Sequence, residues 1–201
     1  MNKYIVVNQP ENWTISPENT KIISSRDYLT NPEFAKLKNV RIFNLCKDYS
    51  YQSKGYYVSL LAEARGHSAI PTIRNLVDLG EPKLVRIVSD EFDDLIQRSF
   101  KSLKSKEFTL SIYFGQNVAA KYKELSATFF RHFQIPLLRV RFTYTTKWNI
   151  KNIKAISEAE IPEEHKESMF AFAEQYFSKK RYDTPKLSSY EYDLAILVKD
   201  G

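Results

Sequence analysis

The sequence predicts an α/β fold with a mixed β-sheet, helices packed on it, Rossmann-like βα units near the N-terminus, and a later β-hairpin and helix. Three observations support this class. Residues 40–45 form an apolar run typical of a buried strand, and a polar, glycine-containing loop follows it. The next segment has helical periodicity and ends at Gly66, a natural C-cap. Residues 137–145 and 148–156 flank a short turn, which predicts a hairpin.

The remaining elements follow from local patterns. Short apolar runs predict strands at residues 4–7, 21–24, 84–88 and 108–114. Helices are expected to begin at Asn31-Pro32, at Ser89 or Asp90, and at Pro162, because each start offers a cap or a proline at the first helical position. A further helix is expected from the apolar repeat of Val118, Tyr122, Leu125 and Phe129.

The helix after residue 53 is expected to bury one face against the sheet. The residues at helical spacing on that face are Tyr57, Leu60, Leu61 and Ala64. The opposite face carries Gln52, Tyr56, Ser59 and Glu63. The pattern therefore predicts which side of this helix meets solvent.

Composition bounds the class of protein. The 201 residues suffice for one good core or two small ones, and 43% hydrophobic with 27% charged residues is typical of a globular chain. A formal charge of +6 admits nucleic acid, anionic ligands or plain solubility. The single Cys46 favours a reducing compartment, and neither a signal peptide nor an apolar run of about 20 residues is present. We therefore expect a cytoplasmic protein without a membrane partner.

The loop after residues 40–45 is the best candidate for a ligand site, because ligands bind α/β proteins at the carboxyl ends of strands. The candidate contacts are Lys47, Tyr51, Gln52, Lys54, Gly55 and Tyr56. Backbone N–H groups at the start of the helix, with Lys47 or Lys54 near by, could hold a carboxylate or phosphate. The same residues could instead pack the helix or contact another domain, and both interpretations stay open. The five glycines of the chain are too sparse for a nucleotide-binding loop.

Other reactive residues predict little chemistry. Glu63, Arg65 and His67 follow one another at spacings of two, and residues at that spacing do not lie on the same face of a helix. A surface ion pair and a loop histidine are therefore favoured over acid–base catalysis. Cys46 is interpreted as a half-buried structural thiol. His132 and His165 have no ligand spacing around them, and no metal site or catalytic residue is predicted.

A cationic surface is expected on the later hairpin. Arg139, Arg141 and Thr143 share one face of a strand, and the neighbouring strand supplies Lys147, Lys151 and Lys154. With Tyr144 or Trp148 for stacking, this face could bind RNA. An acidic partner domain or plain solvation explains it equally well.

Six stretches of the sequence also carry a family resemblance. The most specific is YQSKGYYVSLLAEARGH at residues 51–67, and the supporting stretches are residues 25–29, 41–46, 112–115, 136–140 and 161–165. Together they resemble the N-terminal domain of RimK-like ATP-grasp proteins over nearly the whole chain. The resemblance implies a domain at residues 1–184, with two possible sub-lobes at about 1–82 and 83–184. Residues 185–201 would be a linker and the first strand of a following domain absent from this chain; the alternative is a strand that completes the present sheet.

The resemblance implies that the parent protein is an ATP-dependent carboxylate–amine ligase acting on an amino acid or peptide. ATP and Mg²⁺ would belong to the missing ATP-grasp domain, so no cofactor is expected in this chain. The expected partners are that domain and an amino-acid or peptide substrate, rather than nucleic acid. The chain itself would be a non-catalytic accessory domain that positions substrate, with contacts at the loop residues above or at Arg139 and Arg141. The alternative is a basic module that binds RNA or another polyanion.

Overall fold

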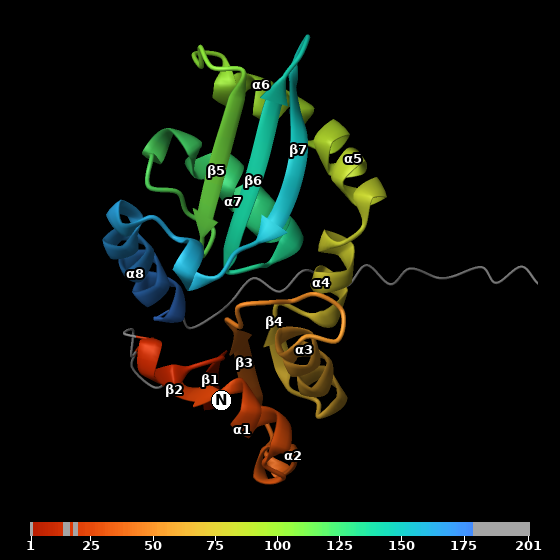
Figure 1. The fold of residues 1–201 in the computed structure, drawn as a ribbon, viewed down its shortest axis with the longest axis vertical. Helices are drawn as coiled ribbons and strands as arrows, with labels where there is room; N and C mark the ends of the chain where they lie inside the picture. The colour runs from red at the N-terminus through yellow and green to blue at the C-terminus, as the bar shows by residue number, and fades with distance from the viewer. Residues whose placement is uncertain (1, 14–16, 18–19, 179–201) are drawn as a thin grey trace, which may run out of the picture.

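The computed structural model describes residues 2–13, 17 and 20–178. It has the expected α/β content, and its strands divide between a parallel and an antiparallel sheet (Figure 1). The expected linker and strand at residues 185–201 lie outside the described residues. All strands of the parallel sheet precede residue 71, and those of the antiparallel sheet follow residue 106. Within the described residues, no helix is both long and apolar enough to cross a membrane.

The parallel sheet has four strands in the order β2-β1-β3-β4. Their bounds are β1 Asn2–Val7, β2 Thr20–Ser24, β3 Val40–Asn44 and β4 Ser68–Ile70. β1 pairs with β2 on one side and with β3 on the other, which places Tyr4 beside Ile42 and Ile5 beside Phe43. The three strands expected in this region are confirmed, and β4 is an additional short strand.

Helices cover both faces of the parallel sheet. Tyr4 and Ile42 pack with residues of α1 (Ser25–Thr30) and α3 (Lys54–Ala64). On the opposite face, Ile5 and Phe43 pack with residues of α8 (Glu163–Phe177). This alternation follows from the strand period of two, which sends successive side chains to opposite faces. Because both faces are buried, the central strands β1 and β3 carry apolar runs at residues 4–7 and 42–43, whereas the edge strand β2 is more polar and only partly buried. The short helix α2 (Glu33–Lys36) follows Asn31 and Pro32 as expected.

The antiparallel sheet has the order β5-β6-β7. Its strands are β5 Glu107–Tyr113, β6 Leu137–Tyr144 and β7 Trp148–Ala155, so the predicted hairpin is confirmed. Leu138, Val140 and Phe142 share a core with residues of α6 (Asp93–Phe100) and α7 (Lys123–Phe133). In Figure 1 α7 lies behind the sheet, which leaves the front face without a covering helix.

The expectation of a strand at residues 84–88 is wrong, because these residues belong to α5 (Pro82–Glu91). Proline occupies the first turn of this helix, and the Glu81 side chain accepts a hydrogen bond from the Lys83 N–H group. Val85, Val88 and Phe92 are spaced as one helical face and pack on the antiparallel core, whereas Ile87 is 56% exposed. The next helix, α6, consequently begins at Asp93 rather than at Ser89 or Asp90.

The two sheets share a hydrophobic cluster centred on α8. Phe43 of β3 contacts Phe177 with ring centroids 4.8 Å apart, and Phe114, just after β5, contacts the same ring at 5.3 Å. The expected start of α8 beside Pro162 is confirmed. Between the sheets on the other side runs α4 (Ile73–Leu79), which begins with a capping box formed by Thr72 and Asn75.

Candidate functional site

The strand–loop–helix unit from β3 to α3 is held by one buried amide. The Asn44 Nδ2 group donates to the Gly55 carbonyl oxygen at 2.7 Å and to Ser59 Oγ at 2.9 Å, and Asn44 Oδ1 accepts from the Cys46 N–H group at 3.2 Å. Ser59 Oγ donates in turn to the Pro71 carbonyl oxygen at 2.7 Å. A single side chain thus fixes the loop and the helix against the end of the strand.

This amide explains why the predicted buried face of α3 is wrong. Ser59 is fully buried because it is the hydrogen-bond partner of Asn44, and Val58 and Ala62 are buried beside it. The helix is therefore rotated so that Tyr57 and Leu60 remain 39% and 37% exposed. Helical spacing identifies a set of residues on one face, but only the partner of Ser59 determines which face turns inward.

Gly55 serves close packing between the helix and the loop. A Cβ atom at this position would collide with the Asp48 carbonyl oxygen and would lie 2.9 Å from Cys46 Cβ. The Ser53 side chain caps the helix by accepting from the Tyr56 N–H group at 3.1 Å and donates to the same Asp48 carbonyl at 2.9 Å. The loop is thus bound tightly to the first turn of α3.

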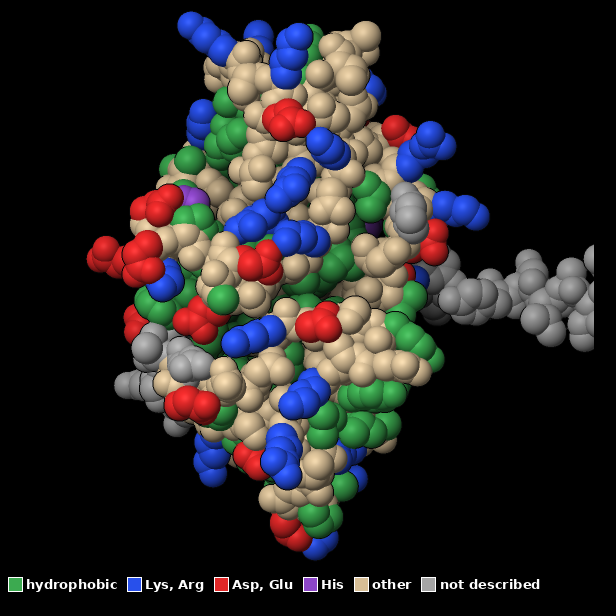
Figure 2. Space-filling view, viewed as in Figure 1, with side chains coloured by type: hydrophobic (Ala, Val, Ile, Leu, Met, Phe, Trp, Pro, Cys, Tyr) green, Lys and Arg blue, Asp and Glu red, His purple; other side chains and the backbone are tan. Residues whose placement is uncertain are grey.

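A cleft of about 610 Å³ lies between this loop, α4 and the end of β7. In Figure 2 the front surface is hollowed where the two sheets meet. The lining residues are Lys47–Tyr51, Tyr56, Leu76, Val77, Leu79–Glu81 and Ile153–Ala155. The cleft lies at the carboxyl end of β3, which is the usual position of a ligand site in a parallel sheet.

The cleft presents charges of both signs beside aromatic and aliphatic surface. Lys47 and Lys154 supply ammonium groups, and Asp48 and Glu81 supply carboxylates. Lys154 is partly neutralised, because its Nζ atom lies 2.6 Å from Glu160 Oε1 and this hydrogen bond lowers the pKa of Glu160. The Lys47 ammonium makes a long contact of 3.5 Å with Gln9 Oε1, and its charge also acts on the Glu158 carboxyl group, whose pKa it lowers against the larger effect of burial.

Two tyrosines complete the polar lining. The rings of Tyr51 and Tyr56 meet edge to face with centroids 5.3 Å apart, and Tyr51 is 75% exposed. Within the part of the chain that the structure describes, neither hydroxyl group has a hydrogen-bond partner. The Tyr49 hydroxyl, by contrast, donates to the Asn44 carbonyl oxygen at 2.8 Å and belongs to the scaffold.

Comparison with known families identifies the chain. The model of the RimK-like ATP-grasp N-terminal domain matches residues 25–172, which is most of the sequence. The chain belongs to this family. No curated protein matches it. The matched segment includes the whole antiparallel sheet, β3 and β4 of the parallel sheet, and the whole loop that lines the cleft, so the RimK-like domain and the candidate site coincide.

The RimK-like domain brings three of the eight predicted contact residues to the cleft, namely Lys47, Tyr51 and Tyr56. Gln52, Lys54 and Gly55 do not line it. Gln52 occupies a turn position with φ of 65°, and Gly55 is a packing residue. The predicted anion site at the start of α3 thus lies apart from the cleft, and Ser53 occupies part of it as the helix cap.

Arg139 and Arg141 lie on the open face of the antiparallel sheet rather than in the cleft. The Arg139 guanidinium donates to the Glu160 carbonyl oxygen at 2.7 Å. Figure 2 shows basic side chains gathered on this face with acidic ones beside them. Three lysines predicted for the surface are paired as well: Lys147 with Asp93, Lys151 with Glu107 and Lys154 with Glu160. Most of the predicted cationic face is therefore neutralised.

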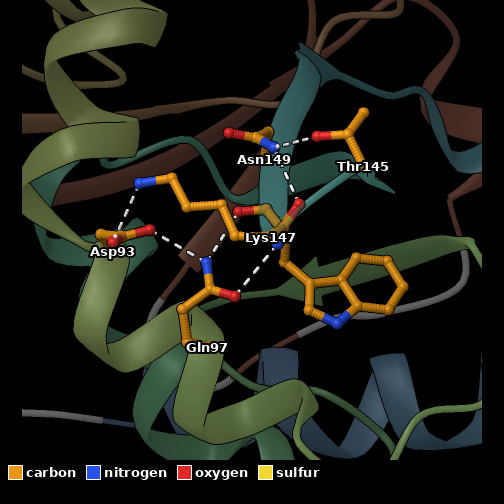
Figure 3. A network of polar contacts seen from close by, with 6 residues as sticks. Asp93, Gln97, Thr145, Lys147 and Asn149 are labelled. Carbon is orange, nitrogen blue, oxygen red and sulfur yellow. Dashed lines mark hydrogen bonds and ion pairs between the residues drawn. The ribbon is translucent and has the colours of Figure 1, made fainter.

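The tip of the hairpin in the RimK-like domain is fixed by α6 (Figure 3). The Gln97 side chain donates to the Trp148 carbonyl oxygen at 2.8 Å and accepts from the Trp148 N–H group at 3.0 Å. Lys147 Nζ lies 3.0 Å from Asp93 Oδ2, and hydrogen bonds from Lys147 and Gln97 lower the pKa of Asp93. The lysine at the turn thus has a structural partner.

The predicted ion pair between Glu63 and Arg65 is wrong, because each residue binds backbone groups elsewhere. Glu63 Oε1 accepts from the Ile73 N–H group at 2.7 Å, and Arg65 donates to the Tyr28 carbonyl oxygen at 2.7 Å. His67 is buried rather than exposed in a loop, with Nδ1 2.8 Å from the Tyr28 hydroxyl, and desolvation lowers its pKa. The side chains of these residues therefore stabilise the fold by hydrogen bonds between segments that are distant in the sequence.

Cys46 is buried, and desolvation raises its pKa to about 12, so its thiol is poorly suited to nucleophilic attack.

Sequence reasoning missed the wall of the cleft that α4 and β7 supply. Leu76, Leu79 and Glu81 come from a segment that was not assigned a helix, and Ile153 lies on the predicted hairpin. Two signals could have revealed α4 and α5: the Thr72-x-x-Asn75 capping box and the Glu81-Pro82 helix start. No local signal indicates that β7 approaches the loop after β3.

Proposed function

We propose that this RimK-like domain is the accessory, substrate-positioning domain of an ATP-grasp carboxylate–amine ligase, and that it binds an amino-acid or peptide substrate in the cleft. The observation that carries the proposal is the cleft itself, which lies at the carboxyl end of β3 and combines ammonium groups, carboxylates and free tyrosine hydroxyls. Family membership supports the class of the parent protein.

The chemistry of the lining suits a zwitterionic ligand. Lys47 would attract a substrate carboxylate, while Asp48 or Glu81 would attract its ammonium group. The hydroxyls of Tyr51 and Tyr56 would bind peptide groups, and Leu76 and Ile153 would contact an apolar side chain. A volume of about 610 Å³ falls in the range of small-ligand sites.

The described residues do not fit ATP with Mg²⁺. The whole sequence has five glycines and lacks a glycine-rich phosphate loop. Within the described residues, no group of three or more His, Cys, Asp or Glu side chains is placed to hold a metal ion. We therefore assign the nucleotide and the metal to an ATP-grasp domain outside the described residues. The RimK-like N-terminal domain would only present the substrate to that ATP-grasp domain.

Titration of the 201-residue chain with glutamate and with the dipeptide Glu-Glu, followed by amide chemical shifts, tests the binding part of the proposal. We expect shifts confined to residues 47–51, 56, 76–81 and 153–155. Lys47→Gln and Tyr56→Phe should each weaken binding about 5-fold or more, the equivalent of one hydrogen bond to a charged or polar ligand group. The matched control, Lys38→Gln, removes an exposed lysine outside the cleft and should bind normally.

Shifts spread over other surfaces, or equal binding by Lys47→Gln and Lys38→Gln, would contradict a ligand role for the cleft. The coding sequence downstream of residue 201 tests the ligase part separately. An ATP-grasp domain in the same reading frame would support it, and an immediate stop codon would contradict it.

A further inference from the structure

A second pocket, of about 440 Å³, lies at the far end of the antiparallel sheet between the loop after α6 and the tip of the hairpin. The lining residues are Gln97, Phe100, Lys101, Leu103–Lys106, Tyr144 and Trp148. It is separate from the cleft described above, since the two pockets share no lining residue. The chemistry of the second pocket is therefore independent of the proposed substrate site.

Three lysines of this pocket differ from the cations on the sheet. Lys101, Lys104 and Lys106 are exposed, and within the described chain their side chains make neither an ion pair nor a hydrogen bond. In Figure 2 the end of the molecule at the top of the view carries basic side chains. Residues 101–106 contain no acidic residue. The loop therefore concentrates around one concave site three positive charges that have no acidic side-chain partner among the described residues.

The pocket also has an aromatic wall. Tyr144 is 43% exposed and meets the Trp148 ring with centroids 5.5 Å apart. Trp148 is itself fixed, because Gln97 binds both of its backbone polar groups and Phe100 packs on its ring at 5.2 Å. The Tyr144 N–H group donates to the Lys106 carbonyl oxygen at 2.8 Å, which brings the lysine backbone beside the tyrosine. A rigid aromatic surface is thus bordered by cations.

We propose that this pocket binds single-stranded nucleic acid, with one base stacked on Tyr144 and the adjoining phosphates held by Lys101, Lys104 and Lys106. Proteins bind single-stranded nucleic acids with exposed aromatic rings and nearby lysines, because the bases stack on the rings and the lysines neutralise the phosphate charges. An acidic peptide would use the lysines but would gain little from the exposed ring. Arg139 and Arg141 do not line this pocket. They lie on the sheet face where Arg139 and Lys154 are near the carboxylate of Glu160.

Fluorescence anisotropy of the 201-residue chain with labelled octauridylate, at several salt concentrations, tests the proposal. The triple variant Lys101→Gln/Lys104→Gln/Lys106→Gln should bind more weakly and reduce the slope of log K against log salt by about 2, as expected for three lost phosphate contacts on a single strand. Tyr144→Ala should weaken binding about 5-fold or more at every salt concentration.

The matched control is Lys21→Gln/Lys36→Gln/Lys38→Gln, which removes the same charge from exposed lysines of the parallel-sheet half. It should retain most of the affinity and the wild-type slope. Because the loop lysines also lie near the negative end of α6, thermal melting of both triple variants should accompany binding.

Three results would overturn the proposal: no octauridylate binding at low salt, equal losses in the two triple variants, or an unchanged affinity in Tyr144→Ala with equally tight binding of polyglutamate. The last result would assign the pocket to an acidic protein partner. None of these outcomes bears on the cleft, so the substrate proposal stands or fails by its own titration.

Discussion

The two sheets of this domain use polar residues in opposite ways. In the parallel half, Asn44, Ser59 and His67 are buried and hydrogen-bonded inside the core. On the open face of the antiparallel half, Lys151 and Lys154 stand at the surface and pair with carboxylates. Buried polar groups must be satisfied because their desolvation is costly, whereas surface ion pairs contribute little. The difference teaches that the buried polar residues of the parallel half specify geometry, whereas the ion pairs on the open face of the antiparallel half add little stability.

The largest expected effect concerns Gly55, where the parallel half is packed most closely. Gly55→Ala would place a methyl group against the Asp48 carbonyl oxygen, so the loop or the helix must move. We expect a loss of about 3 kcal/mol in the free energy of unfolding, measured by urea denaturation. The control is Gly80→Ala, since a Cβ at Gly80 meets its nearest neighbour at an ordinary 3.5 Å. An equal loss at both positions would refute the packing role of Gly55.

The second effect concerns the amide that joins β3 to α3. Asn44→Ala removes three hydrogen bonds and leaves the Cys46 N–H group without its partner. We expect a loss of about 2 kcal/mol by the same measurement. Asn149→Ala is the counterpart in the antiparallel half, where the amide bonds to groups of an exposed turn, and it should cost less than about 0.5 kcal/mol. Similar losses would remove the contrast between the two halves.

The third effect is a pH dependence from His67. Desolvation lowers the pKa of His67 in the folded chain, while a histidine of the unfolded chain has a pKa of about 6.5. The unfolded chain therefore binds more protons between these values, so the stability is present above about pH 6.5 and is lost as the pH falls through the folded pKa. Denaturation at several pH values should show this loss.

His67→Gln should flatten the pH dependence over that window, since glutamine has no proton to gain. A His67→Gln variant with the unchanged pH profile would show that another group is responsible.

The smallest effect is expected for the exposed ion pair at the hairpin tip. The Lys147 and Asp93 side chains are 49% and 32% exposed, so solvent screens their attraction. Lys147→Gln should lower the free energy of unfolding by about 0.5 kcal/mol or less, and high salt should abolish the difference. A loss as large as that of Asn44→Ala would mean that surface pairs also determine the fold.

Much of the architecture was predictable because it depends on local patterns. The apolar runs gave β1, β2 and β3, the alternation and turn gave the β6–β7 hairpin, and Pro162 marked the start of α8. The prediction of a strand at residues 84–88 is wrong because a short apolar run suits a strand and a helix equally, and here the Glu81-Pro82 helix start decides for the helix. The predicted buried face of α3 is wrong because the burial of Ser59 depends on its hydrogen bond with Asn44, which lies ten residues before the helix begins.

The candidate site was predictable only in part. The position of the loop at the end of a strand identified Lys47, Tyr51 and Tyr56, but Lys154 and the α4 wall come from distant segments. The pocket that contains the lysines of residues 101–106 was not predictable, since nothing local shows that Tyr144 lies beside them.

The sequence by itself determined the α/β class, most strands and the family, because periodicity, capping residues and motifs are local properties. Only the tertiary structure decided which face of α3 is buried, which cations are neutralised, and which residues meet in each pocket. Those outcomes depend on pairs of groups far apart in the chain, such as Asn44 with Ser59 and Lys154 with the loop after β3. Hydrogen bonding, desolvation and charge pairing act through distance in space, and only the folded chain sets that distance.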